Sequence, residues 1–195
     1  MAAIAIIQTA LLLAASPAAP QPQVPVPPGA ERVVAHDRWG GQLAICAEVP
    51  RQEAALMQRN GRRLPPTTIF LINGDVIRKV VTGLGGCDPA WAPDGTRLAF
   101  TAPDGLWVIS TTDDTGERIV DTTIEENRYL TLARPRWSPD GMRIAYFATD
   151  RHQTRVQVVA ADTRATVLTS PAAAEDMEWR GPRTLAVGGQ VLSVP

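Results

Sequence analysis

The residues best suited to chemistry are two aspartates that occupy the same place in two similar segments. Asp94 lies in Pro93-Asp94-Gly95, and Asp140 lies in Pro139-Asp140-Gly141. A carboxylate can act as a general acid or base, or can bind a metal ion. In this tripeptide, however, proline presets the first corner of a type I turn, aspartate bonds to the backbone two residues on, and glycine accepts a left-handed conformation. The tripeptide therefore predicts a tight turn, with both aspartates as turn residues.

The other groups that could bind a metal ion or attack a substrate lack the spacing that such sites require. His36 and His152 are the only histidines, and neither lies in a metal-binding motif. No serine lies in a Gly-x-Ser-x-Gly elbow. A solvated acidic patch, without the spacing of a calcium-binding loop, is predicted for Asp113, Asp114, Glu117, Asp121, Glu125 and Glu126. We expect no catalytic residue, no metal ion and no cofactor, and we expect both histidines at the surface or at strand ends.

The two cysteines, Cys46 and Cys87, are candidates for a disulfide. An even number of cysteines in an exported protein favours a bond between them. Cys46 would end the second strand of one repeat and Cys87 would precede the first strand of the next, so adjacent repeats could bring them within bonding distance. A bond would close a loop of about 40 residues and add about 3 to 4 kcal/mol. The alternative is two separate buried thiols.

The composition limits the classes of partner and fold. Lys and Arg total 19, Asp and Glu total 20, and the net charge is −1. This balance gives no electrostatic attraction for nucleic acid or for an anionic membrane surface. Hydrophobic residues make up 45% of the 195 residues, enough for the core of one domain, while 17 prolines and 15 glycines divide the chain into short elements. We therefore expect no nucleic-acid partner and no all-helical fold.

A repeat organises the sequence. The segment Trp91–Phe100 (WAPDGTRLAF) returns as Trp137–Tyr146 (WSPDGMRIAY), and weaker copies contain Trp39 and Trp179. The tryptophans are spaced by roughly 40 to 50 residues, as in the blades of a β-propeller. The repeat therefore indicates the fold more strongly than any single residue does.

Each repeat predicts a small antiparallel sheet. The residues before tryptophan form a first strand, and the turn leads into a second strand. The second, third and fourth strands are expected at 97–101, 105–110 and 117–120 in one repeat, and at 143–147, 155–160 and 165–169 in the next. Four short antiparallel strands are typical of a propeller blade, and the large tryptophan side chain would pack between neighbouring sheets.

The two decamers resemble the repeat of the TolB-like β-propellers, a group related to the Trp-Asp repeat. The central copies match its Trp-Ser-Pro-Asp-Gly-x-x-[Ile/Leu]-Ala-[Phe/Tyr] pattern closely, whereas the outer copies match only at tryptophan and the following Leu-Ala pair. The resemblance implies an all-β propeller over about 31–195. It also implies a structural role for Trp39, Trp91, Pro93, Asp94, Gly95, Trp137, Pro139, Asp140, Gly141 and Trp179. The fold occurs in periplasmic scaffolds, lyases and peptidase domains of this group, so it says little about function.

The number of repeats leaves two architectures open. Four blades are expected at about 31–83, 84–127, 128–170 and 171–195, fewer than the roughly six to eight blades that such propellers usually contain. A closed four-bladed ring would need Glu31–His36 as the missing strand of the last blade. An incomplete, open propeller would leave sheet edges exposed, and bare edges invite pairing with a second copy or a partner. We expect a monomeric unit, with self-association if the propeller is open.

The N-terminus differs in composition from the repeats. Residues 1–15 carry no charged side chain, and small residues follow. An apolar stretch this short is typical of a secretory signal peptide rather than a membrane span, which needs about 20 apolar residues. The alternatives are an uncleaved anchor or a misassigned start. We expect a signal peptide over 1–18, a Pro-rich linker over 19–30 and a location in the periplasm or outside the cell, with no later membrane-spanning segment.

An insertion in the first blade offers a second place for function. Residues 51–66 contain a basic cluster of Arg59, Arg62 and Arg63. Long loops on a rigid scaffold often bind partners. The alternative is a solvated surface loop.

Three functions fit these observations. The first is a non-catalytic scaffold that binds another protein of the cell envelope. The second is a small-ligand, carbohydrate-binding or lyase-like propeller, which would need arginine, histidine and acidic side chains converging on the inner strands. The third is an inactive remnant of a propeller-containing peptidase. We expect the first, and no enzymatic activity.

Overall fold

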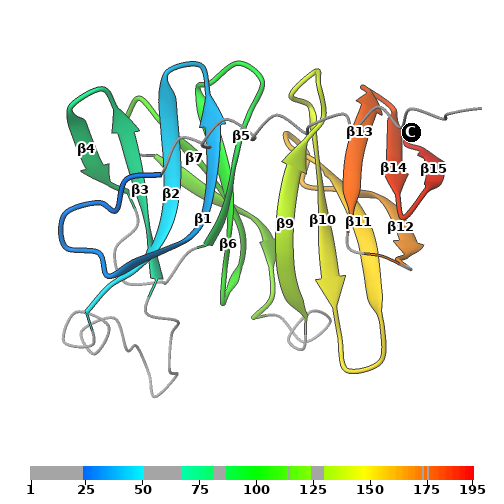
Figure 1. Cartoon of the computed structure of the whole chain (residues 1–195). Coiled ribbons are helices and arrows are strands. Elements are labelled where there is room, and N and C mark those ends of the chain that lie inside the picture. Colours follow the sequence, from blue (N-terminus) through cyan, green and yellow to red (C-terminus); the bar gives the residue numbers. More distant parts are fainter. Residues whose placement is uncertain are drawn as a thin grey trace, which may run out of the picture.

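The computed structural model describes residues 24–50, 67–80, 87–113, 115–123, 130–172, 174 and 176–195. These residues form four antiparallel sheets that lie side by side in chain order (Figure 1). We call the sheets blades 1 to 4. Blade 1 contains β1 (Arg32–Trp39), β2 (Gln42–Glu48), β3 (Thr67–Asn73) and β4 (Val76–Lys79). Blade 2 contains β5 (Cys87–Trp91), β6 (Arg97–Ala102), β7 (Gly105–Ser110) and β8 (Gly116–Asp121).

The C-terminal half repeats this arrangement. Blade 3 contains β9 (Thr131–Trp137), β10 (Arg143–Thr149), β11 (Thr154–Ala160) and β12 (Thr166–Pro171), and blade 4 contains β13 (Met177–Gly181), β14 (Thr184–Val187) and β15 (Gln190–Ser193). Within each blade, consecutive strands pair in chain order. The prediction of an all-β propeller with four blade-like repeats is confirmed, and the second, third and fourth strands of blades 2 and 3 lie where the repeat places them.

The propeller is open. In the part of the chain that the structure describes, no strand of blade 1 pairs with a strand of blade 4. The strand proposed to close a ring, Glu31–His36, instead enters β1, where His36 pairs with Ile45 of β2. The closed-ring alternative is wrong because a two-residue turn at Gly40-Gly41 joins β1 to β2. A local hairpin of this kind costs far less chain entropy than pairing with a blade at the other end of the chain.

Apolar seams hold each blade against the next. Trp91 is buried between blades 1 and 2, and Trp137 is buried between blades 2 and 3. Trp179 is half-buried between blades 3 and 4. Since blade 2 covers one face of blade 1 and residues 24–30 cover the other, the middle of β2, Leu43–Ala47, is an unbroken buried run rather than an alternating one.

The tryptophan indoles also bond the blades together. Trp137 Nε1 donates to the carbonyl of Ala90 in the preceding blade at 3.0 Å, and Trp179 Nε1 donates to the carbonyl of Arg136 at 3.0 Å. Trp39 lies in the first blade and donates forward, to the carbonyl of Pro93 at 2.9 Å. Trp91 departs from this pattern, because its Nε1 is buried without a partner among the described residues.

The N-terminal segment covers the outer face of blade 1. Val24 and Ala30 pack against Leu43, Ile45 and Phe70, which point away from blade 2, and Pro27 is buried. The expectation of a linker over 19–30 that stays outside the core is therefore wrong for residues 24–30. In the described residues no blade precedes this sheet, and its apolar face gains by packing against Val24, Pro27 and Ala30.

The Pro-Asp-Gly turns have closely similar geometry in blades 2 and 3. Asp94 Oδ1 accepts the N–H of Thr96 at 2.9 Å, and Asp140 Oδ1 accepts the N–H of Met142 at 3.1 Å. Gly95 and Gly141 have φ values of 69° and 68°. Each carboxylate also pairs with the arginine three residues on, at 3.4 Å and 3.2 Å. Both aspartates therefore act locally, in the turn.

Gly95→Ala should destabilise the protein more than Gly40→Ala. Both glycines have a positive φ, 69° and 53°, so alanine is strained at either site by about 1–2 kcal/mol. A Cβ at Gly95 would lie 2.4 Å from Cε3 of Trp39, whereas a Cβ at Gly40 would meet nothing within 4 Å. We expect an additional loss of about 1–3 kcal/mol at Gly95, measured by urea unfolding. Equal losses would show that the Trp39 ring moves aside freely.

Asp140 should stabilise the fold at neutral pH and lose this effect in acid. Burial would raise the pKa of its carboxyl, but the Ser138 hydroxyl, the Met142 N–H and the charge of Arg143 outweigh burial and hold the pKa below its ordinary 3.8. A pKa lowered by folding gives stability that is present above the unfolded value and lost as pH falls through the folded value. Asp140→Asn should therefore cost about 1–2 kcal/mol at pH 7 and progressively less below about pH 4. Urea titrations across this range would contradict the prediction if the loss stayed constant.

Candidate functional site

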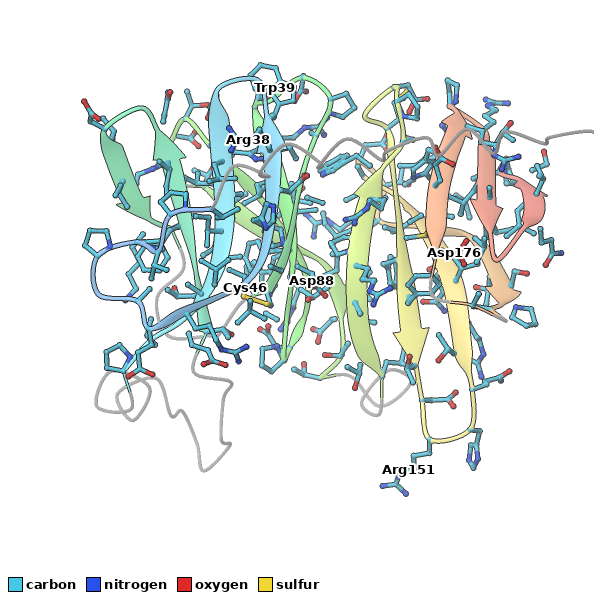
Figure 2. All side chains as sticks on the ribbon, in the orientation of Figure 1. Arg38, Trp39, Cys46, Asp88, Arg151 and Asp176 are labelled. Carbon is cyan, nitrogen blue, oxygen red and sulfur yellow. A yellow bond between two sulfur atoms is a disulfide. The ribbon has the colours of Figure 1, made fainter. Side chains whose placement is uncertain are left out.

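The first strands of all four blades meet at a cavity of about 420 Å³. Its ionisable lining residues are His36 of β1, Asp88 of β5, Arg134 and Arg136 of β9, and Asp176 just before β13. Ala35, Pro89, Phe147 and Met177 supply its apolar wall. Figure 2 shows Asp88 on blade 2 and Asp176 beside blade 4, with the strands of blade 3 between them. The volume falls within the range of about 300–1,000 Å³ that is usual for ligand pockets.

Two irregular strand positions turn polar groups toward this cavity. Asp88 and Arg134 both have a φ of 51°, an uncommon conformation for residues with a side chain. The pairing of β5 with β6 shifts between Cys87 and Ala90, and the pairing of β9 with β10 shifts beside Arg134. The two irregularities meet, since Asp88 Oδ2 accepts the N–H of Arg134 at 3.0 Å. β-bulges of this kind often redirect side chains next to a binding site.

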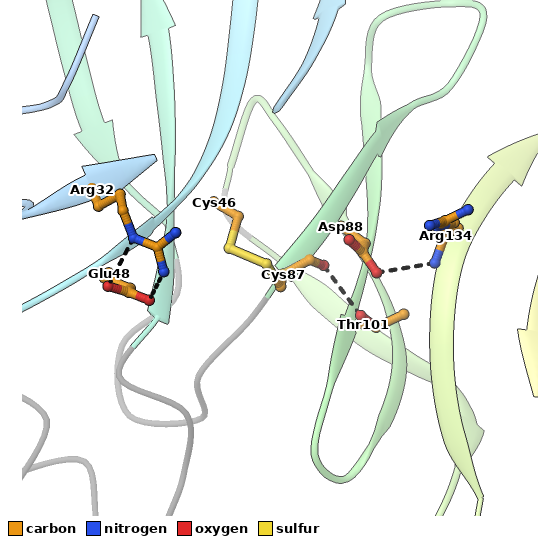
Figure 3. The surroundings of a disulfide bond; sticks show 7 residues. All are labelled: Arg32, Cys46, Glu48, Cys87, Asp88, Thr101 and Arg134. Atoms are coloured by element: carbon orange, nitrogen blue, oxygen red, sulfur yellow. Dashed lines mark hydrogen bonds and ion pairs between the residues drawn. A yellow bond between two sulfur atoms is a disulfide. The ribbon is translucent and has the colours of Figure 1, made fainter. Parts of the chain in front are cut away.

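A disulfide fixes the chain immediately before Asp88. Cys46 of β2 and Cys87 of β5 are bonded, with their Cα atoms 5.0 Å apart (Figure 3). The carbonyl of Cys87 also accepts the hydroxyl of Thr101 at 3.3 Å. The structure thus places the two cysteines together rather than as separate thiols, and the bond joins blades 1 and 2. Cys87 opens β5, whereas the sequence placed it just before that strand.

The remaining residues singled out from the sequence lie elsewhere. The repeat tryptophans form the seams, and the Pro-Asp-Gly residues form turns. Arg59, Arg62 and Arg63 lie outside the described residues. His152 is exposed in the loop between β10 and β11, but His36 lies in the middle of β1 and lines the cavity. His36 is not at a strand end, but it is exposed, as His152 is, so both histidines lie at the surface as expected.

Half of the acidic cluster, Asp114, Glu125 and Glu126, lies outside the described residues, and the other three acids make local contacts. Glu117 pairs with Arg164, and Asp121 pairs with Arg118 at 2.5 Å. The Ser110 hydroxyl, followed by the hydroxyl and N–H of Thr115, lowers the pKa of the Asp113 carboxyl, which accepts both Thr115 groups. Among the described residues, no group of three or more His, Cys, Asp and Glu side chains is arranged to hold a metal ion. The same residues contain no helix long and apolar enough to span a membrane.

The cavity residues share a place in the repeat that the sequence reading missed. His36, Asp88, Arg134 and Asp176 each lie three residues before the tryptophan of their own repeat, namely Trp39, Trp91, Trp137 and Trp179. Since each tryptophan fixes the register of its first strand, the residues three positions before the tryptophans all face the cavity. A polar residue stands at this position in every repeat, and this was the sequence signal that could have predicted a shared site.

Solved structures resemble this arrangement. TolB from Acinetobacter baumannii superposes with a TM-score of 0.53 at 17% identity, over 78% of this chain and 41% of that one. The chain has the fold of a TolB-like β-propeller. The propeller domain of the trilobed protease from Pyrococcus furiosus, described as having an open velcro topology, gives a TM-score of 0.55 at 12% identity, over 78% of this chain and 46% of that domain.

The likeness of this TolB-like propeller to longer proteins is partial. The acylaminoacyl peptidase of Pyrococcus horikoshii gives a TM-score of 0.57 at 12% identity, over 78% of this chain but 27% of the peptidase. The chain thus spans less than half the length of each of these three proteins. No protein-family model matches the sequence, and no curated protein matches it. At these identities the likeness establishes the fold alone.

Proposed function

We propose that this chain is a non-catalytic scaffold of the cell envelope that binds another protein on the surface around the inner cavity. The observation that carries the proposal is the cavity itself, where ionisable side chains converge from, or directly before, the first strands of four blades. Rigid elements hold binding groups in place more accurately than loops do. The TolB-like fold, shared with an A. baumannii protein named TolB, supports this choice.

Two further features support the proposed location. The uncharged, apolar residues 1–15 are typical of a signal peptide. A disulfide between Cys46 and Cys87 persists in an oxidising compartment such as the periplasm. Together they support a location in the periplasm or outside the cell.

The test is affinity capture from envelope extract, with the full chain carrying a C-terminal tag. We expect one saturable protein partner that untagged chain displaces. Arg136→Glu, which reverses a charge in the cavity, should remove this partner. Arg183→Glu is the matched control, because Arg183 is exposed in the turn between β13 and β14, away from the cavity. Capture that is absent, or that survives Arg136→Glu unchanged, would contradict the proposal.

The cavity also suits the second candidate, a site for a small molecule. Its mixture of arginine, histidine and carboxylate side chains is the arrangement that a small-ligand propeller would need on its inner strands. A panel of uronates and small esters, assayed for binding and turnover, tests this candidate. Binding without capture of any protein would favour it over the scaffold.

A further inference from the structure

The guanidinium of Arg136 forms no direct ion pair with a carboxylate of the described residues, although Asp88 and Asp176 line the same cavity. Within the described ranges, its guanidinium makes one hydrogen bond, from Nη1 to the carbonyl of Pro135 at 3.0 Å, and no ion pair. By contrast, Arg143 pairs with Asp140 at 3.2 Å and Arg155 pairs with Asp150 at 2.9 Å. A carboxyl oxygen fits the unused donors of a guanidinium well, because the planar fork can hold two oxygens at once.

The backbone of Arg136 is held firmly. Arg136 pairs with Ala145 across β9 and β10, and its carbonyl accepts Trp179 Nε1 at 3.0 Å. Its Cα is therefore fixed by two blades. A fixed backbone reduces the conformational entropy that this residue loses when a ligand arrives, which favours affinity.

The two aspartates in the cavity limit how much negative charge a ligand can carry there. Asp88 and Asp176 face the same space as Arg134, Arg136 and His36. One oxygen of Asp88 accepts the N–H of Arg134, so this carboxylate is held in place. Two negative charges in the cavity, one of them held in place, repel a phosphate dianion or a polyanion more strongly than a single carboxylate.

The remaining wall of the cavity is apolar. Phe147 and Met177 lie beside the charged groups, with Pro89 and Ala35. An apolar side chain next to the carboxylate would gain by burial against this wall. The chemistry therefore fits a short polypeptide segment with one acid and a neighbouring apolar residue.

We propose that the cavity binds a single carboxylate of a polypeptide, with Arg136 as the carboxylate-binding residue and with the adjacent apolar residue against Phe147 and Met177. The proposal rests on the proposed protein-binding function and names the chemistry of the partner at that site. The carboxylate belongs either to an aspartate or glutamate side chain or to a C-terminus.

Synthetic peptides test this directly. The full chain would be titrated with Ac-Phe-Asp-Gly-NH₂, with its amide counterpart Ac-Phe-Asn-Gly-NH₂, and with Ac-Gly-Phe, which ends in a free carboxylate. Calorimetry gives the affinities, and ¹⁵N-¹H spectra locate the contacts. We expect at least one carboxylate peptide to bind tenfold or more tightly than the amide peptide, with the largest shifts at Arg136 and His36. The stronger of the two carboxylate peptides identifies the source of the group.

Matched variants make the test specific. Arg136→Gln should abolish the preference for the carboxylate, and Arg136→Lys should reduce it, since lysine retains the charge but not the fork. Arg183→Gln should leave it unchanged. The proposal is overturned if carboxylate and amide peptides bind the wild type alike, if Arg183→Gln has the same effect as Arg136→Gln, or if inorganic phosphate displaces the peptide as effectively as acetate.

The two proposals fail differently. A protein partner captured in a manner dependent on Arg136, combined with equal binding of Asp and Asn peptides, would leave the scaffold function standing and overturn carboxylate recognition. Selective peptide binding without any captured partner would support carboxylate recognition and remove the scaffold function.

Discussion

Trp137→Ala should remove about 3–5 kcal/mol from the free energy of unfolding, the range for truncating a large buried aromatic. The side chain is only 7% exposed and lies in the seam between blades 2 and 3. The Arg97 guanidinium covers its ring at 4.6 Å, and its Nε1 donates to the Ala90 carbonyl. A loss of this size is a large fraction of the total stability of about 5–15 kcal/mol of a typical domain. Urea unfolding followed by circular dichroism measures it.

The matched control is Trp39→Ala. Trp39 has the same place in its repeat and also donates an indole hydrogen bond to a neighbouring blade, but it is 37% exposed. Because less of its surface is buried, we expect a loss of no more than about 2 kcal/mol. Losses of similar size for the two variants would mean that burial in the seam is not what makes Trp137 important.

Removal of the disulfide should cost about 4 kcal/mol. Cys46 and Cys87 are separated by 41 residues, and a closed loop of that length restricts the unfolded chain by about this amount. Wild type in reductant and the Cys46→Ala/Cys87→Ala double variant should both show a lower urea midpoint than oxidised wild type. The double variant loses slightly more, because Cys46 is fully buried and its sulfur leaves a small void.

Reductant should have no effect on the double variant, and this is the control for non-specific effects. An unchanged midpoint of wild type in reductant would contradict the prediction. Reduction should also weaken amide protection of Arg134 in hydrogen exchange, since the acceptor of that N–H is Asp88, the residue directly after Cys87.

The sequence predicted the elements that depend on local chemistry. The Pro-Asp-Gly turns and the tryptophans of blades 2 and 3 identified the hairpins and seams, because turn geometry and side-chain size act over a few residues. The sequence left open whether Glu31–His36 closes a ring, because its pairing depends on a competition between the adjacent strand β2 and a blade at the other end of the chain. The hairpin with β2 wins that competition through the short turn at Gly40-Gly41.

The features that the sequence did not predict are the cavity and the covered face of blade 1, and both depend on how the blades are arranged in space. Residues 24–30 were read as a linker from their prolines, although Leu43, Ile45 and Phe70 needed a covering segment once no blade preceded them. The cavity was missed because a space between four strands cannot be read from any one of them. The polar residues three positions before each tryptophan were visible, but only the arrangement of the blades shows that they meet.

The covered face of blade 1 has a consequence for assembly. Two open arcs could in principle join head to tail into one ring with twofold symmetry, the last blade of each copy docking on the first blade of the other. Val24, Pro27 and Ala30 occupy the surface that such docking would use. A second copy would have to displace this segment before it could add its own blade. Residues 24–30 thus cap this face of the arc and oppose the docking of a further blade, as capping repeats do at the ends of a solenoid.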